Sequence, residues 1–162
     1  MHPTLQNLLT RTPVLTDGAW GTQLQLRGLT TGACPDAWNL EKPDLVEQVA
    51  RAYVEAGSRI VLTNTFGANR FTLERYGMAE KVAEINRTGV EISRRAAADS
   101  ALVFGSIGPS GKMLMMGDVT EDDLRAAFAQ QAAAMAEAGA NGIVVETMSD
   151  AAELKLAVAA AK

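Results

Sequence analysis

Four short apolar runs, each followed by a stretch with helical periodicity, set the strongest constraint on how this chain can fold. The runs cover residues 14–16, 59–63, 102–107 and 142–146, and they recur about every 40 residues. The second and fourth runs are apolar without alternation, which is typical of strands that are covered on both faces in a parallel sheet.

The stretches between the runs predict helices. Apolar side chains recur on one face between residues 45 and 56, and again between residues 82 and 96. Thr120, with Asp123 three residues later, has the pattern of a capping box and predicts the start of a third helix. Ser149 predicts the start of a fourth helix, which runs to the end of the sequence.

Alternating strands and helices at this spacing predict an α/β fold, with right-handed crossovers and a parallel sheet. The pattern fits two architectures, a small doubly wound sheet or the first four units of an eight-stranded barrel. We find no linker or second domain, so residues 1–162 are treated as one unit. Two long connections, 26–43 and 113–119, are expected to be irregular binding loops.

Composition and charge exclude several classes of function. The net charge of -4 argues against a nucleic-acid surface, which would concentrate lysine and arginine. The sequence shows no secretory leader and no apolar run of about 20 residues, so we expect neither export nor a membrane span. The single cysteine, Cys34, fits a reducing compartment, and we expect a cytoplasmic protein. The single histidine, His2, gives no support for a nucleophile with a histidine base.

Polar residues follow each predicted strand, where the carboxyl ends of parallel strands form α/β active sites. Asp17 and Glu146 are the acids of this set, and two carboxylates at one site suit an ammonium group, acid–base work or a metal. A turn-forming role for Asp17 and a helix-dipole role for Glu146 remain open. Asn64 and Phe66 suit a small polar ligand with an apolar stem.

Several motifs occur together in one order along the chain. They are LTDGAWGT (15–22), WNL (38–40), KPD (42–44), YVEAG (53–57), TNTF (63–66), GSIGP (105–109) and ETM (146–148). In this combination the chain resembles the homocysteine S-methyltransferase family. The resemblance implies a TIM barrel in which zinc binds the homocysteine thiol. Zinc favours the thiolate, which attacks a methyl group carried by a sulfonium, a quaternary amine or methylcobalamin.

The resemblance also implies a role for each strand-end residue, all of them in substrate binding. Asp17 and Glu146 would hold the amino group of the substrate, because an ammonium group binds carboxylates. The turn at Gly18 and Ala19, together with the backbone from Ser106 to Gly108, would shape the amino-acid pocket. The wall of that pocket would consist of Asn64, Thr65 and Phe66. The resemblance assigns no catalytic residue to this chain.

The sequence departs from the family at the metal. The three zinc cysteines of the family lie in the second half of the barrel, and Cys34 corresponds to none of them, so this chain is expected to hold no metal. We therefore expect the N-terminal half of a homocysteine-binding barrel, acting with homocysteine and a methyl donor. Cobalamin would come from another domain or partner.

Three alternatives stay open. The first is a half-barrel that pairs with a second copy or with the missing half. The second is a non-catalytic α/β binding or assembly module without the zinc site. The third, a flavodoxin-like nucleotide domain, has only its strand count in favour.

Overall fold

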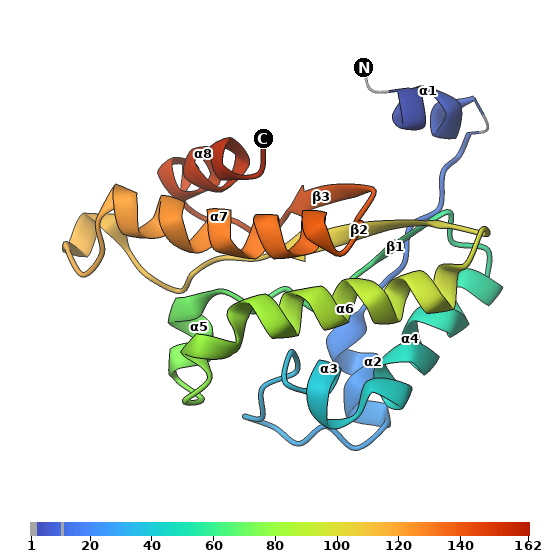
Figure 1. The fold of residues 1–162 in the computed structure, drawn as a ribbon, viewed down its shortest axis with the longest axis horizontal. Coiled ribbons are helices and arrows are strands. Elements are labelled where there is room, and N and C mark those ends of the chain that lie inside the picture. Colours follow the sequence, from blue (N-terminus) through green and yellow to red (C-terminus); the bar gives the residue numbers. More distant parts are fainter. Residues whose placement is uncertain (1–2, 11) are drawn as a thin grey trace.

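Three parallel strands and a row of helices make up the computed structural model, which describes residues 3–10 and 12–162 (Figure 1). The strands are β1 (Ile60–Leu62), β2 (Leu102–Ile107) and β3 (Gly142–Val145). The helices are α1 (Pro3–Leu9), α2 (Trp20–Leu26), α3 (Trp38–Glu41), α4 (Pro43–Glu55), α5 (Arg70–Glu74), α6 (Val82–Ala97), α7 (Glu121–Glu137) and α8 (Ala151–Ala160). Two short 3₁₀ turns, η1 (Ala79–Lys81) and η2 (Leu114–Met116), complete the order.

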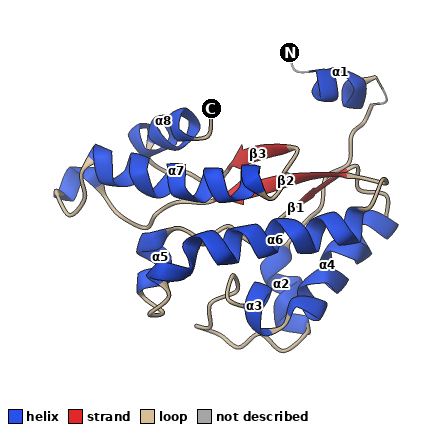
Figure 2. Ribbon diagram, in the orientation of Figure 1, coloured by secondary structure: helices blue, strands red, loops and turns tan. Residues whose placement is uncertain are grey.

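The sheet has the order β1-β2-β3, and both pairings are parallel. Leu62 is in register with Phe104 of β2, and Ile107 at the end of β2 is in register with Val145. The crossovers run through α6 and α7, and the helices α4, α6, α7 and α8 pack side by side in that order (Figure 2). The predicted α/β fold with a parallel sheet is confirmed, and all carboxyl ends of the strands meet at one edge.

The first predicted strand, at 14–16, is wrong as a strand, although the segment lies where that strand was expected. Thr16 forms one isolated parallel bridge with Ile60, and the backbone N–H of Asp17 donates to the carbonyl of Ile60 at 3.1 Å. Beyond this bridge the N–H of Leu62, which is the next donor along β1, donates to the side chain of Asp17 at 2.8 Å and not to a backbone carbonyl of the segment. The ladder therefore ends after a single bridge.

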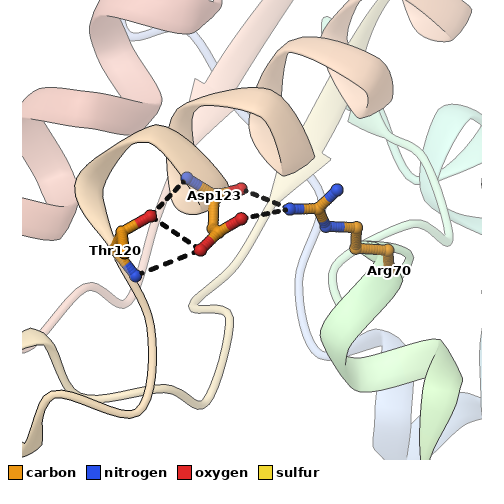
Figure 3. Close-up of polar contacts among 3 residues, drawn as sticks. All are labelled: Arg70, Thr120 and Asp123. Atoms are coloured by element: carbon orange, nitrogen blue, oxygen red, sulfur yellow. Dashed lines mark hydrogen bonds and ion pairs between the residues drawn. The ribbon is translucent and has the colours of Figure 1, made fainter.

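The predicted capping box at the start of α7 is confirmed (Figure 3). Thr120 Oγ1 accepts the backbone N–H of Asp123 at 3.1 Å, and Asp123 Oδ2 accepts the N–H of Thr120 at 3.3 Å. The hydroxyl of Thr120 also donates to Asp123 Oδ2 at 2.6 Å, and this bond, together with the one from the Thr120 N–H, holds the pKa of the Asp123 carboxyl below its usual value. Arg70 of α5 donates to the carbonyl of Asp123 at 3.0 Å and to its carboxylate, so α5 is attached to the same helix start.

The predicted helices at 45–56 and 82–96 correspond to α4 and α6, but two other details of the helix prediction are wrong. The last helix begins after Asp150, not Ser149, because the Asp150 side chain accepts the N–H of Ala152 at 2.8 Å. The connection 26–43 is not irregular throughout, since it contains α3, and 113–119 contains η2. Trp38 opens α3 and is buried, so packing of its indole accounts for a helical turn in that loop.

The main hydrophobic core lies between the sheet and the helices that cover it. Val61, Val103 and Ile107 of the strands pack with Phe128 and Met135 of α7. All four residues of β3 stay partly exposed because β3 pairs only with β2. None of the helices within the described ranges has the length and apolar composition needed to cross a bilayer.

Gly105 of β2 has no room for a side chain, because an added Cβ would overlap the sulfur of Met135. We expect Gly105→Ala to lower the free energy of unfolding by about 1–3 kcal/mol through overpacking. Urea unfolding measures this loss. The matched control is Gly21→Ala in α2, where nothing lies within 4 Å of the added Cβ. The control should be neutral or stabilising, and equal effects of the two substitutions would contradict the packing assignment.

Candidate functional site

A cavity of about 430 Å³ lies at the carboxyl ends of the strands. Its lining residues are Gly18, Ala19, Trp20, Gly21, Pro35, Asp36, Leu62, Thr63, Asn64, Phe66, Gly67, Thr72, Tyr76, Ser106, Pro109 and Glu146. Among residues 3–10 and 12–162, this lining includes acidic and aromatic side chains and no lysine, arginine or histidine. A larger hollow of about 740 Å³, beneath α1, has Arg59 as the one charged residue among the described residues that line it. The strand-end cavity is therefore the candidate site.

Asp17 lies immediately behind the cavity lining and is held in place by two hydrogen bonds. Its Oδ2 accepts the indole N–H of Trp20 at 2.6 Å and the backbone N–H of Leu62 at 2.8 Å. Burial raises the pKa of the Asp17 carboxyl above its usual value, these hydrogen bonds oppose the rise, and the nearby charge of Glu146 adds to it. Asp17 is therefore near enough to Glu146 for the two charges to interact, although only Glu146 is a lining residue of the cavity.

Glu146 lines the cavity directly and is oriented by Ser106. The hydroxyl of Ser106 donates to Glu146 Oε1 at 2.6 Å. The backbone N–H of Ser106 donates in turn to Thr63 Oγ1 at 3.1 Å. The structure thus brings the ends of β1, β2 and β3 together through one serine, which itself lines the cavity.

The turn predicted at Gly18 and Ala19 also lies on the cavity wall. Tyr53 of α4 donates its hydroxyl to the carbonyl of Ala19 at 3.3 Å. A Cβ at Gly18 would lie 3.3 Å from the same hydroxyl oxygen. Tyr53 therefore supports this turn from behind, and a side chain at residue 18 would press on it.

Of the residues predicted for the pocket wall, Asn64 and Phe66 line the cavity, whereas Thr65 and Gly108 are not among its lining residues. Thr65 is fully buried and donates its hydroxyl to the carbonyl of Ser106 at 2.9 Å. The N–H of Gly108 donates to the carbonyl of Phe66 at 2.9 Å. Thr65 and Gly108 therefore support the wall from behind.

Sequence reasoning missed Asp36, a buried acid on the cavity wall. Asp36 Oδ1 accepts the backbone N–H of Gly67 at 3.0 Å, and Cys34 Sγ lies 3.8 Å from Oδ2. Burial raises the pKa of the Asp36 carboxyl to about 6. Burial and the charge of Asp36 raise the pKa of the Cys34 thiol to about 11. Asp36 follows no strand, so the strand-end pattern could not reveal it.

Trp20 and Tyr76 were also missed as lining residues. Trp20 stands inside the motif at 15–22, so its position beside Asp17 offered a signal in the sequence. Tyr76 lies in the turn after α5, and that helix was not predicted.

The described residues do not fit a zinc site. Within residues 3–10 and 12–162, no three histidine, cysteine, aspartate or glutamate side chains come together in a way that could hold a metal ion. Structural zinc needs about four ligands, whereas the acid beside the Cys34 thiol is Asp36 and no third ligand joins them among the described residues. His2 lies outside the described residues.

Known proteins resemble this chain over nearly its whole length. A family model described as homocysteine S-methyltransferase matches residues 14–162. A methionine synthase of Mycobacterium tuberculosis is 36% identical over an alignment of 166 positions, which covers 95% of this chain and 14% of that protein. A methionine synthase of Mycobacterium leprae is 37% identical over 154 residues, covering 88% of this chain and 13% of that protein.

Solved structures of the homocysteine methyltransferase MmuM from Escherichia coli share the fold. The metallated form has a TM-score of 0.81 and 25% identity, over 94% of this chain and 60% of that chain. The oxidized form has a TM-score of 0.82 and 26% identity, over 96% and 60%. The chain thus spans about one seventh of the length of these methionine synthases and 60% of these structures.

The raised pKa of Asp36 predicts a pH dependence of stability. The folded state raises this pKa from 3.8 to about 6. The neutral acid therefore stabilises the fold below about pH 4, and this contribution is lost as the pH rises through 6. We expect Asp36→Asn to lack this loss. Its free energy of unfolding should therefore rise by about 2–3 kcal/mol relative to that of the wild type as the pH goes from 4 to 7.

Urea unfolding of both proteins across this pH range measures the difference. Asp17 titrates in both proteins, so its contribution cancels. The matched control is Asp99→Asn, which removes an exposed carboxyl and should follow the wild type at every pH. Parallel curves for the wild type and Asp36→Asn would contradict the assignment.

Proposed function

The chain belongs to the homocysteine S-methyltransferase family, and on that premise we propose that it forms the amino-acid-binding part of an S-methyltransferase acting on homocysteine. In the proposed reaction, the thiol sulfur gains a bond to the methyl group, the bond from methyl to donor breaks, and the thiol proton is released. The observation that carries the proposal is a pair of acids at one cavity: Glu146 lines it, Asp17 lies immediately behind the lining, and no lining residue that the structure describes is cationic.

The two carboxylates suit the ammonium group of an amino acid. Each already has one oxygen fixed, Asp17 Oδ2 by Trp20 and Leu62, and Glu146 Oε1 by Ser106. A carboxylate oriented in this way can accept a charge-assisted hydrogen bond at its other oxygen. An ammonium group also offsets the charge of two nearby acids, which otherwise repel each other.

The rest of a small amino acid has a place in the same cavity. The N–H groups of Ser106 and Gly108 are engaged with Thr63 and Phe66, so the substrate carboxylate is assigned to the turn at Gly18 and Ala19. The apolar stem of the substrate is assigned to the wall around Phe66. A cavity of about 430 Å³ has the size of a small-ligand site.

We further propose that residues 1–162 supply the first four of eight βα units of a TIM barrel. The parallel sheet supports this architecture, as do the strand-end site and the likeness to structures of which the chain covers 60%. The partly exposed β3 and the single bridge at Thr16 are the two edges that the remaining units would cover.

Zinc dependence is proposed for the whole enzyme and not for this chain. The usual pKa of a free thiol is about 8.5, so a homocysteine thiol needs help to ionise at neutral pH. Since Cys34 and its neighbours do not fit zinc, the metal is assigned to residues outside this sequence. Cobalamin is likewise assigned to another domain or partner. A cytoplasmic location is proposed from the single cysteine.

A second candidate is a non-catalytic module that binds an amino acid or assembles with another chain. The buried, protonated Cys34 and the poor fit to zinc favour it. This candidate expects a defined dimer by light scattering and no methyl transfer after the rest of the barrel is supplied. The methyltransferase proposal expects transfer under the same conditions.

Asp17→Asn and Glu146→Gln should each weaken binding of L-homocysteine to the chain by about tenfold or more, because each removes a charged partner of the ammonium group. Isothermal titration calorimetry measures the affinities. The matched ligand is 4-mercaptobutanoic acid, which lacks the amino group. It should bind the wild type weakly and should not respond to either substitution.

The matched protein controls are Asp99→Asn and Glu55→Gln, which alter exposed acids outside the cavity lining. They should leave homocysteine affinity unchanged. If both ligands respond alike to Asp17→Asn and Glu146→Gln, these acids do not hold the amino group and the assigned pose fails.

Metal removal should not change this binding in the 162-residue chain. The groups assigned to the substrate are carboxylates and backbone, so the affinity for homocysteine should be the same with and without a chelator such as EDTA. Calorimetry in zinc-supplemented and EDTA-treated buffer checks the expectation. A large loss of affinity in EDTA would place a metal in this half and contradict the assignment of zinc to residues outside the sequence.

A further inference from the structure

Asp36 lines the cavity but has no part in the function proposed above. It stands in the loop before α3, its side chain is only 4% exposed, and it faces the turn that follows β1. A carboxylate is costly to bury unless it makes hydrogen bonds. The contacts of Asp36 therefore indicate why an acid stands there.

The Asp36 carboxylate packs directly on the backbone of Gly67. Oδ1 accepts the Gly67 N–H at 3.0 Å, and a Cβ added to Gly67 would lie 3.0 Å from Oδ2. Both oxygens thus lie close to one residue of the turn after β1. Only a residue without a side chain fits there without moving the carboxylate.

Further hydrogen bonds join the same two segments beside this contact. The amide of Asn64 donates to the carbonyl of Pro35 at 2.8 Å. The amide of Asn39 donates to the carbonyl of Asn64 at 2.8 Å, and Asn39 Oδ1 accepts from the Asn64 amide at 3.1 Å. The hydrogen bond from the Gly67 N–H to Asp36 adds a further link between the two segments, one residue beyond Phe66.

Phe66 is therefore fixed between two glycines. On one side is Gly67, bound to Asp36. On the other side is Gly108, whose N–H donates to the carbonyl of Phe66 and whose added Cβ would lie 2.6 Å from the ring. The ring is 43% exposed and forms part of the cavity wall. A shift of the Gly67 backbone would move the ring and change the width of the cavity.

We propose that Asp36 is a positioning residue of this cavity: its carboxylate fixes the backbone at Gly67 and thereby holds the Phe66 ring in place as the cavity wall. The positioning itself follows from contacts within the chain. Its effect on affinity rests on the proposed function, in which the apolar stem of homocysteine packs on Phe66.

Protonation of Asp36 should loosen this contact, because a neutral acid accepts a weaker hydrogen bond than a carboxylate. Burial raises the pKa of this carboxyl to about 6, so the change falls between pH 5 and pH 7. The titratable side chain in contact with Asp36 is Cys34, and burial raises the pKa of its thiol to about 11, so the thiol stays neutral throughout. The other titratable groups around the cavity are Asp17, Glu146 and Tyr76.

The first experiment is independent of any ligand. In ¹⁵N-labelled chain, the backbone amide resonance of Gly67 should shift with a midpoint near pH 6 in the wild type. The shift should be absent in Asp36→Asn and retained in the matched control Asp99→Asn. A Gly67 resonance that does not titrate in the wild type, or that titrates equally in Asp36→Asn, would overturn the positioning role.

The second experiment measures L-homocysteine affinity by calorimetry between pH 5 and pH 8. Wild type should bind about fivefold more tightly than Asp36→Asn at pH 8, and the ratio should approach one at pH 5, where both side chains are neutral. The other acids near the cavity are the same in both proteins, so their contributions cancel in this ratio. Asp36→Ala should lose about tenfold at pH 8, and Asp36→Asn should recover part of that loss.

The two experiments separate the two proposals. If wild type binds no homocysteine, the proposed function fails, and the Gly67 resonance alone decides whether Asp36 positions the wall. If wild type binds homocysteine and the ratio to Asp36→Asn is flat with pH, the wall does not depend on the Asp36 carboxylate and the positioning proposal fails.

Discussion

The site depends on the hydrogen bonds of Ser106, which tie three strand ends together at the cavity. Its N–H donates to Thr63 Oγ1, its carbonyl accepts from Thr65 Oγ1, and its hydroxyl donates to Glu146. Parallel pairing brings the carboxyl ends to one edge, but pairing alone does not orient their side chains. The hydroxyl of Ser106 fixes the side chain of Glu146 at this edge, where its charge lies near that of Asp17.

Most of the fold and part of the site could be predicted from the sequence, because both follow from local periodicity. Apolar runs at regular spacing predict parallel strands. Parallel strands place Asp17, Asn64 and Glu146 at one edge of the sheet, and this placement does not depend on how the helices pack. The first run failed as a strand for a non-local reason: the N–H of Leu62, which would extend its pairing with β1, donates to the Asp17 side chain instead. A local sequence pattern does not show which partner each backbone N–H will have in the folded chain.

Asp36 could not be predicted for a related reason. It reaches the cavity only because the loop before α3 folds back onto the turn after β1, where Asn39 and Asn64 exchange amide hydrogen bonds. These contacts join residues that are 25 positions apart and follow no helical or strand period. Thr65 and Gly108 show the converse case. Their motifs mark the right edge of the sheet, yet their groups face into the protein and support the wall from behind.

Burying Asp17 and Asp36 at this cavity lowers the stability of the fold, and a purely structural role would not explain why acids stand there. Burial raises the pKa values of Asp17 and Asp36, so each is less favourable as a carboxylate than it would be in water. Amides or hydroxyls could accept the same backbone hydrogen bonds without that loss. Sites that bind ligands commonly retain such unfavourable groups because the ligand compensates them. Under the proposed function, an ammonium group would compensate Asp17 and Glu146. Asp36 makes no contact with the substrate in the proposed pose, so its effect would act through the position of the cavity wall.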